Sequence, residues 1–194
     1  MLRRVVAMLL IVTGISVAAG QGPAAAPAWS ELGTTSRLSG SPAASAGKPA
    51  RPGLPVRVLV AGLGVDAPVV PIGAAQGVLT PPADPNTVGW WEGGAVPGRQ
   101  RGSVVITGHT VQGGVGAFDE LGSLEPGDLV AIETGRRLVR YRVTSTDVWS
   151  RRALAKRSER IFDPTGPARL VLVTCDDWDG TAYRSNAVVT ARPA

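Results

Sequence analysis

The sequence predicts a mainly β domain, a closed or nearly closed barrel of short strands, between Leu54 and Ala194. Seven or eight β-rich runs in this region are separated by turn residues at the spacing typical of such barrels. Helical periodicity is weak, and 194 residues fit one domain with appendages. A single cysteine excludes an intrachain disulfide, and one cysteine with one histidine argues strongly against a structural zinc site.

The expected strands follow from short apolar and β-branched runs. Val56–Val60 alternates with a period of two, which indicates a half-buried strand. Val65–Ile72 contains Pro68 and Pro71, so we expect an edge or irregular strand there. Val104–Thr107 is compact and apolar and predicts a buried strand. The other expected strands are Asp128–Thr134, Leu138–Trp149 after a hairpin turn at Gly135-Arg136, Arg169–Cys175 and Ala187–Ala191.

Helical signal is confined to three short stretches. We expect turns near Asp84–Trp91 and Phe118–Leu121 and a short helix over Ala153–Arg160.

The N-terminal segment, residues 1–24, has the pattern of an export signal. Arg3 and Arg4 precede an uncharged run from Val5 to Ala19. As a helix this run would be roughly 22 Å long, short of the ~30 Å hydrocarbon core, which slightly favours a cleaved signal peptide over an uncleaved membrane anchor. Both place the domain outside the cytoplasm, membrane-anchored or secreted to the cell envelope. Residues 25–53 are rich in Pro, Ala, Ser and Gly and are expected to form a disordered linker.

The net charge of +5 is unevenly distributed. Residues 1–53 carry +4 of it and residues 54–194 only +1. Within the domain, residues 136–160 hold nine basic residues against two acidic ones. Such a strip is most often a solvated face, and it could also meet a cell-wall polymer or lipid headgroups. No nucleic-acid motif accompanies it, so we expect no nucleic-acid partner.

Three polar residues are expected at strand ends, where a rigid sheet can direct their side chains into a single cleft at one end of the barrel. His109 follows Val104–Thr107, Cys175 ends Arg169–Cys175, and Arg184 opens the last strand. A thiol is a strong nucleophile only as thiolate, which a nearby imidazolium favours, and an arginine can stabilise an oxyanion. Taken singly, a buried hydrophobic cysteine, a surface histidine and a solvated arginine stay open as alternatives.

The segments around these residues resemble the sortase family. VVITGHT at 104–110 resembles the segment that bears the catalytic His of sortases, LVLVTC at 170–175 their TLxTC signature, and YRSNAVV at 183–189 the segment of the catalytic Arg. The order His, Cys, Arg is the family's order. The resemblance runs from about Val56 to Ala191 and is closest to class F, or class E, sortases of actinobacteria.

The resemblance implies an eight-stranded sortase barrel as the catalytic domain over 54–194. It implies a cysteine transpeptidase that cleaves an LPxTG-like C-terminal sorting signal of exported proteins between Thr and Gly. Cys175 would be the nucleophile, His109 the general acid and base, Arg184 the stabiliser of oxyanion and substrate, and Thr174 a substrate-binding residue. The thioacyl intermediate would pass to an amine of a peptidoglycan precursor or a pilin lysine. No cofactor is implied.

The pair Asp176-Asp177 after Cys175 departs from the small residues we expect there. Two carboxylates should raise the pKa of the thiol unless they point away or pair with Arg184. With Asp179 they form an acidic cluster that lacks the spacing of a calcium loop, so no metal site is expected. The alternatives are another exported thiol enzyme, such as an L,D-transpeptidase, and a tethered β-barrel binding module without activity.

Overall fold

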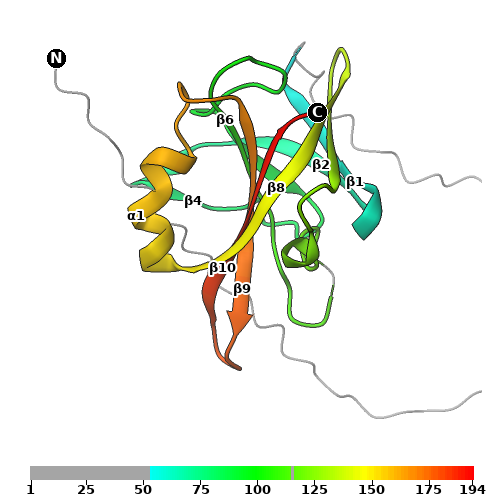
Figure 1. Cartoon of the computed structure of the whole chain (residues 1–194). Helices are drawn as coiled ribbons and strands as arrows, with labels where there is room; N and C mark the ends of the chain where they lie inside the picture. The colour runs from blue at the N-terminus through cyan, green and yellow to red at the C-terminus, as the bar shows by residue number, and fades with distance from the viewer. Residues whose placement is uncertain (1–52, 115) are drawn as a thin grey trace, which may run out of the picture. The chain divides into compact units, whose positions relative to one another are not determined.

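The computed structural model describes residues 53–114 and 116–194, so the expected segment 1–24 and all but the last residue of the expected linker 25–53 lie outside the described residues. Eight strands form a closed barrel in the order β1-β2-β5-β6-β9-β10-β8-β7 (Figure 1). Their bounds are β1 Pro55–Val60, β2 Val65–Ile72, β5 Val88–Trp91, β6 Ser103–Thr107, β7 Leu129–Thr134, β8 Leu138–Ser150, β9 Arg169–Trp178 and β10 Tyr183–Pro193. This confirms the predicted fold class.

Smaller elements decorate the barrel. They are η1 Ala61–Leu63, the two-stranded sheet β3 Ala74–Ala75 and β4 Val78–Leu79, η2 Leu121–Ser123, and the helix α1 Arg151–Ile161. The side chain of Ser150 caps α1 by accepting a hydrogen bond from the backbone N–H of Ala153. Helix α1 confirms the helix expected over Ala153–Arg160. Among the described residues, no helix has the length and apolar character needed to span a bilayer.

The expected turn near Asp84–Trp91 is only half right, because its second half is strand β5. Asp84 does start a turn, with its carboxylate accepting from the backbone N–H of Asn86 at 3.0 Å. Val88–Trp91 then pairs in parallel with β2 and antiparallel with β6. The two neighbouring strands supply the hydrogen bonds that four residues could not secure alone, so barrel closure overrides the local turn signal.

Strand β2 is irregular, as expected, but it is not an edge of the sheet. Its first half, Val65–Pro68, pairs with β1, and its second half, Val69–Ile72, pairs with β5. Each half therefore has one hydrogen-bonded neighbour. Proline has no backbone N–H and cannot donate a hydrogen bond to a neighbouring strand. Because each half of β2 is paired on one side only, this divided pairing accommodates Pro68 and Pro71 inside a closed barrel.

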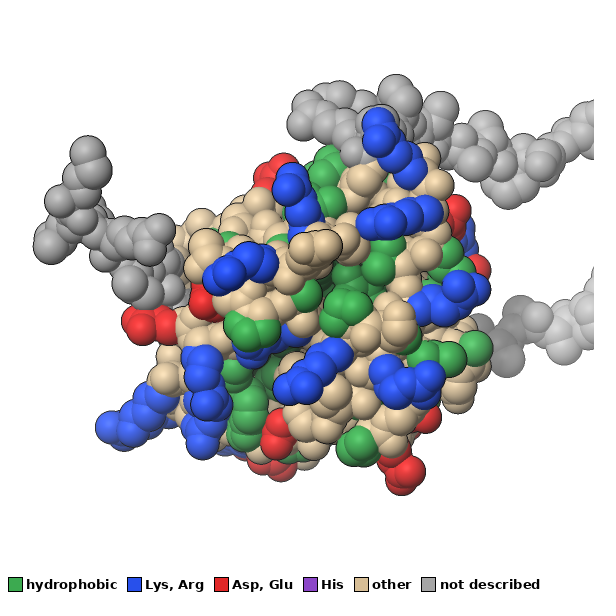
Figure 2. All heavy atoms as spheres, turned by 45° about the horizontal axis from the view of Figure 1, so that its top comes forward, with side chains coloured by type: hydrophobic (Ala, Val, Ile, Leu, Met, Phe, Trp, Pro, Cys, Tyr) green, Lys and Arg blue, Asp and Glu red, His purple; other side chains and the backbone are tan. Residues whose placement is uncertain are grey.

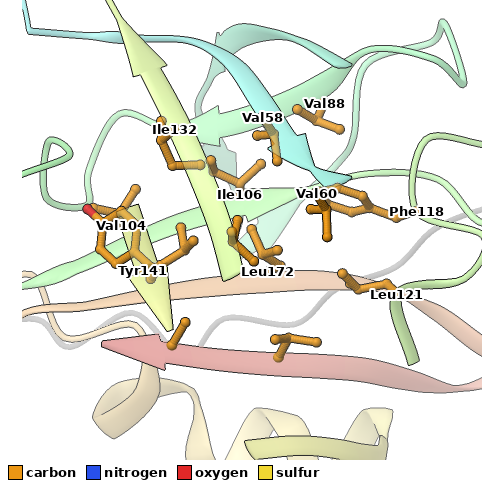
Figure 3. Packing of buried hydrophobic residues seen from close by; sticks show 14 of the residues in the cluster. Val58, Val60, Val88, Val104, Ile106, Phe118, Leu121, Ile132, Tyr141 and Leu172 are labelled. Carbon is orange, nitrogen blue, oxygen red and sulfur yellow. The ribbon is translucent and has the colours of Figure 1, made fainter. Parts of the chain in front are cut away.

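Strand β9 is buried on both faces. Leu170 and Leu172 point into the barrel interior, whereas Val171 and Val173 pack under α1 with Leu154. Figure 3 shows the interior side, with Leu172 beside Ile106 and Val60. A strand between two apolar layers needs an unbroken apolar run, which explains the sequence from Leu170 to Val173.

Strands β6 and β9 run in parallel, from Ser103↔Arg169 to Thr107↔Val173. Both therefore deliver their C-terminal residues to the same end of the barrel, shown with the β9–β10 tip at the bottom of Figure 1. The opposite end carries the β7–β8 hairpin and the C-terminus. This polarity positions the candidate site.

Candidate active site

The parallel pairing of β6 and β9 brings the histidine and cysteine segments together. Beyond the last paired residues, the backbone N–H of Gly108 donates to Val173 at 3.1 Å. The hydroxyl of Thr174 donates to the carbonyl of Gly108 at 3.1 Å and lies 2.7 Å from the hydroxyl of Thr110. Thr174 thus links the C-terminal ends of β6 and β9. It immediately precedes Cys175 in the sequence, and its partner Gly108 immediately precedes His109.

Cys175 lies within β9 rather than at its end, because the strand continues to Trp178. Its side chain is only 4% exposed. Burial, opposed by the charge of Arg151 and assisted by that of Asp176, raises the pKa of Cys175 to about 11. At neutral pH only about one thiol in ten thousand would be ionised, so the resting thiol is protonated.

The expected effect of the two aspartates on the thiol holds for Asp176, which raises the pKa of Cys175, but burial is the larger cause. The carboxylate of Asp176 accepts a hydrogen bond from the backbone N–H of Asp177 at 2.7 Å and is not paired with Arg184. Asp177 has a φ of 61°, a left-handed conformation that bends the strand after the cysteine.

The imidazole of His109 is anchored through Nε2, which lies 2.6 Å from the carbonyl oxygen of Pro82. A carbonyl oxygen only accepts, so Nε2 must carry the proton and donate it. In the neutral ring the free lone pair is then on Nδ1. When protonated, His109 also contributes to the lowered pKa of Asp84, after the hydrogen bonds from Thr87 and Asn86. The segment from Pro82 to Asp84 therefore holds the ring.

Arg184 does not approach the thiol in this state. Its guanidinium forms an ion pair with Asp179 across the β9–β10 turn, and its side chain is 64% exposed. Asp179 also accepts the backbone N–H groups of Ala182 and Thr181, and these bonds, ahead of Arg184, lower the pKa of its carboxyl. The partner of Arg184 is thus Asp179, rather than Asp176 or Asp177.

Arg184 nevertheless lies on the face of the sheet that bears the thiol. Asn186 is the register partner of Cys175, and side chains of directly opposed residues share a face. Arg184 is two residues from Asn186, about 7 Å along the strand and on the same side. A rearrangement of one exposed side chain would bring its guanidinium over the cysteine.

Two further residues belong to this site that sequence reasoning did not single out. Arg151 begins α1, donates to the carbonyl of Tyr183 at 2.9 Å, and is the cation whose charge lowers the pKa of Cys175. Asn186 is 2% exposed, and its Nδ2 has no hydrogen-bond partner among the described residues. A buried donor without a partner costs free energy and is uncommon. Its position opposite the thiol therefore indicates a role in the site.

A pocket of about 340 Å³ opens beside the thiol. It is lined by Thr110, Asp119, Glu120, Gly122, Ser123, Thr174, Cys175, Asp176 and Ala187. Three of these residues are acidic, which makes the mouth favourable for cationic groups. His109 and Arg184 lie outside this lining.

The family follows from a match that covers most of the chain. Residues 58–194 match the sortase domain. The chain belongs to the sortase family. No curated protein matches the sequence significantly.

Solved structures agree with this sortase fold. Sortase C-1 from Actinomyces oris aligns with a TM-score of 0.58 at 20% identity, covering 71% of this chain and 72% of that one. Sortase C2 of Pilus Island 1 from Group B Streptococcus gives 0.57 at 19%, covering 71% and 72%. A lid mutant of sortase A from Corynebacterium diphtheriae gives 0.56 at 18%, covering 75% and 72%. Sortases are cysteine transpeptidases, and this sortase is therefore an enzyme of that kind.

Proposed function

We propose that this sortase cleaves an LPxTG-like sorting signal between Thr and Gly and transfers the acyl fragment to an amine of the cell envelope. The observation that carries the proposal is the junction of β6 and β9, where Thr174 bonds to Gly108 and places Cys175 and His109 at neighbouring strand ends. This is the placement that a nucleophile and its proton carrier require. Motif resemblance supports class F, with class E as the alternative.

In the first half-reaction the thiol proton of Cys175 passes to the free Nδ1 of His109, the Sγ attacks the Thr carbonyl carbon, and the carbonyl oxygen becomes an oxyanion. Collapse of this intermediate breaks the bond to the Gly nitrogen, which leaves as an amine after taking a proton from His109. In the second, an incoming amine loses a proton to His109 and attacks the thioester carbonyl. The Sγ of Cys175 leaves as a thiolate and takes this proton from His109, and a new amide bond forms.

The resting geometry implies that the substrate helps to complete the site. Arg184 must exchange Asp179 for the substrate before it can stabilise the oxyanion. Because the ion pair is exposed, this exchange costs about 1 kcal/mol or less. The unpartnered Nδ2 of Asn186 is available to donate to negative charge on the sulfur or on the oxyanion.

The export pattern of residues 1–24 and the family's substrates support a location in the cell envelope. The acceptor would be a peptidoglycan precursor amine or a pilin lysine, and the donor an exported protein with a C-terminal sorting signal.

The test is mass spectrometry of intact protein after incubation with a small panel of LPxTG-type peptides. We expect an adduct on Cys175 with the mass of the acyl fragment that ends at Thr, and release of that fragment on addition of hydroxylamine. The matched control is Cys175→Ala, which should give neither adduct nor product. Product formation by Cys175→Ala at the wild-type rate would overturn the proposal.

A further inference from the structure

The barrel end opposite Cys175 carries a concentration of arginines that the transpeptidation site does not use. We call this group the arginine rim. It consists of Arg99, Arg101, Arg136, Arg137, Arg140, Arg142, Arg169 and Arg192. Figure 2 tilts this end toward the viewer and shows Lys and Arg side chains spread over the visible face, with hydrophobic and a few acidic side chains between them.

The hydrogen-bond pattern places these arginines at one end. Arg169 is the first residue of β9, six residues before Cys175, so the rim and the thiol are about 20 Å apart along the strand. Arg192 is the register partner of Arg142. Arg137, in the hairpin turn, donates to Gly98 at 3.3 Å, which joins the hairpin to the loop of Arg99.

Carboxylates lie near the rim, with Asp163 close enough to feel the charge of Arg169 and Glu133 opposite Leu138, but they form no ion pair with it among the described residues. Within the described ranges, none of the eight arginines forms an ion pair; Arg101, Arg137, Arg142 and Arg169 donate to backbone carbonyls instead. Those hydrogen bonds orient a guanidinium, but a neutral carbonyl does not neutralise its charge. The other seven basic residues of 54–194 face fourteen acidic ones, three of which line the Cys175 pocket. The domain is therefore electrically polarised, with its positive end away from the site.

The chain enters the barrel at this same end. Strand β1 starts at Pro55, which pairs with Thr134 just before the hairpin turn. Everything N-terminal to Pro55, including the basic and apolar run of residues 3–19, is thus connected to the domain beside the arginine rim. A segment held in a membrane would therefore be joined to the domain at this end, through residues 20–52.

Exposed leucines lie among the arginines. Leu129 is 48% exposed and Leu138 40% exposed. Leu129 pairs with Arg142, and Leu138 is two residues from Arg140 on the same strand, so all four side chains share the outer face of β7 and β8. Apolar side chains among cations suit the boundary between headgroups and acyl chains better than a fully hydrated polymer.

We propose that the arginine rim, with Leu129 and Leu138, docks on an anionic lipid surface. Docking would hold the barrel upright and point the acidic Cys175 pocket away from the membrane, toward the envelope. The guanidinium groups would bind headgroup phosphates, and each is expected to strengthen the interaction about fivefold.

The test is residue-by-residue labelling of arginines with phenylglyoxal, read by mass spectrometry. The full chain is mixed with an excess of phosphatidylcholine vesicles, with or without a third of phosphatidylglycerol. We expect anionic vesicles to slow labelling of Arg136, Arg140 and Arg192 by about fivefold or more and to leave Arg152, at the end of α1 away from the rim, unchanged. High salt should abolish the difference.

A pair of charge-matched variants makes the test specific. The first variant combines Arg136→Gln, Arg140→Gln and Arg192→Gln and should weaken docking about 100-fold. Its docking is measured by the protection of Arg99 and Arg169 from labelling. The control combines Arg152→Gln, Lys156→Gln and Arg157→Gln on α1. It removes the same charge and should change docking less than fivefold.

Three results would overturn the proposal. The first is an equal loss of docking in both variants, and the second is an unchanged rate of arginine labelling on anionic vesicles. The third is protection of the arginines from labelling by soluble poly(glycerol phosphate) but not by vesicles. The last would assign the rim to a wall polymer. Labelling does not require catalysis, so failure of docking and failure of the proposed function are read separately.

Discussion

The protonation state of Cys175 governs what the resting enzyme can do. Because burial raises its pKa to about 11, the thiolate fraction should grow about tenfold per pH unit up to that value. We expect the rate of alkylation by iodoacetamide to rise throughout pH 7 to 10. An ordinary exposed thiol would instead level off above about pH 9. A plateau below pH 9.5, with the fold intact by circular dichroism, would contradict the structure.

The neighbours of Cys175 should shift this profile in opposite directions. Arg151→Met removes the charge that lowers the pKa of Cys175, so alkylation at pH 8 should slow by roughly threefold. Asp176→Asn removes a charge that raises it, so alkylation should accelerate by a similar factor. Shifts of the same sign in both variants would show that the two side chains act through packing rather than charge.

Asn186 combines a structural cost with a place opposite the nucleophile. Replacing it by Leu, of similar size, removes a buried donor without a partner and should raise the free energy of unfolding by about 1 kcal/mol. If its Nδ2 donates to developing negative charge, kcat should fall by about tenfold or more in the same variant. Urea unfolding and peptide turnover measure the two effects. Unchanged kcat would remove Asn186 from the mechanism.

At the scale of elements, the β9–β10 turn restrains Arg184. Asp179→Asn keeps a side-chain oxygen for the backbone N–H groups of Thr181 and Ala182 but weakens the ion pair. We expect a melting temperature close to wild type and kcat/KM raised by up to about threefold, since Arg184 is released. A loss of activity as large as that of Arg184→Ala would mean that Asp179 holds Arg184 in its working position.

The sequence predicts elements whose pattern is local and misses those that depend on closure. Val104–Thr107 and Leu138–Trp149 carry their own period, and the structure confirms both as strands. Val88–Trp91 follows a strong turn signal and becomes a strand only because β2 and β6 lie on either side. The same limit applies to the site. Motif order predicts Cys175 and His109, but the pairing of Arg184 with Asp179 depends on how one turn bends, which no motif encodes.

At the scale of the whole molecule, charge separates the two ends of the barrel, and this separation has a cost. Arg142 and Arg192 oppose each other directly across β8 and β10. Like charges in such pairs destabilise a sheet by roughly 0.2–1 kcal/mol, and no ion pair among the described residues relieves them. A surface selected for stability alone would carry an acid at one of these positions.

Neutralising one member of this pair should therefore stabilise the fold. We expect Arg192→Gln to raise the melting temperature by about 1–3 °C at low ionic strength, and 1 M salt to erase the gain because it screens the repulsion. Arg99→Gln is the control, since Arg99 lies in a loop without a cross-strand partner and should leave the melting temperature unchanged. A lower melting temperature for Arg192→Gln would mean that the arginine stabilises the sheet. A stabilised variant that also docks more weakly on anionic vesicles would show that the rim is maintained for binding at the expense of stability.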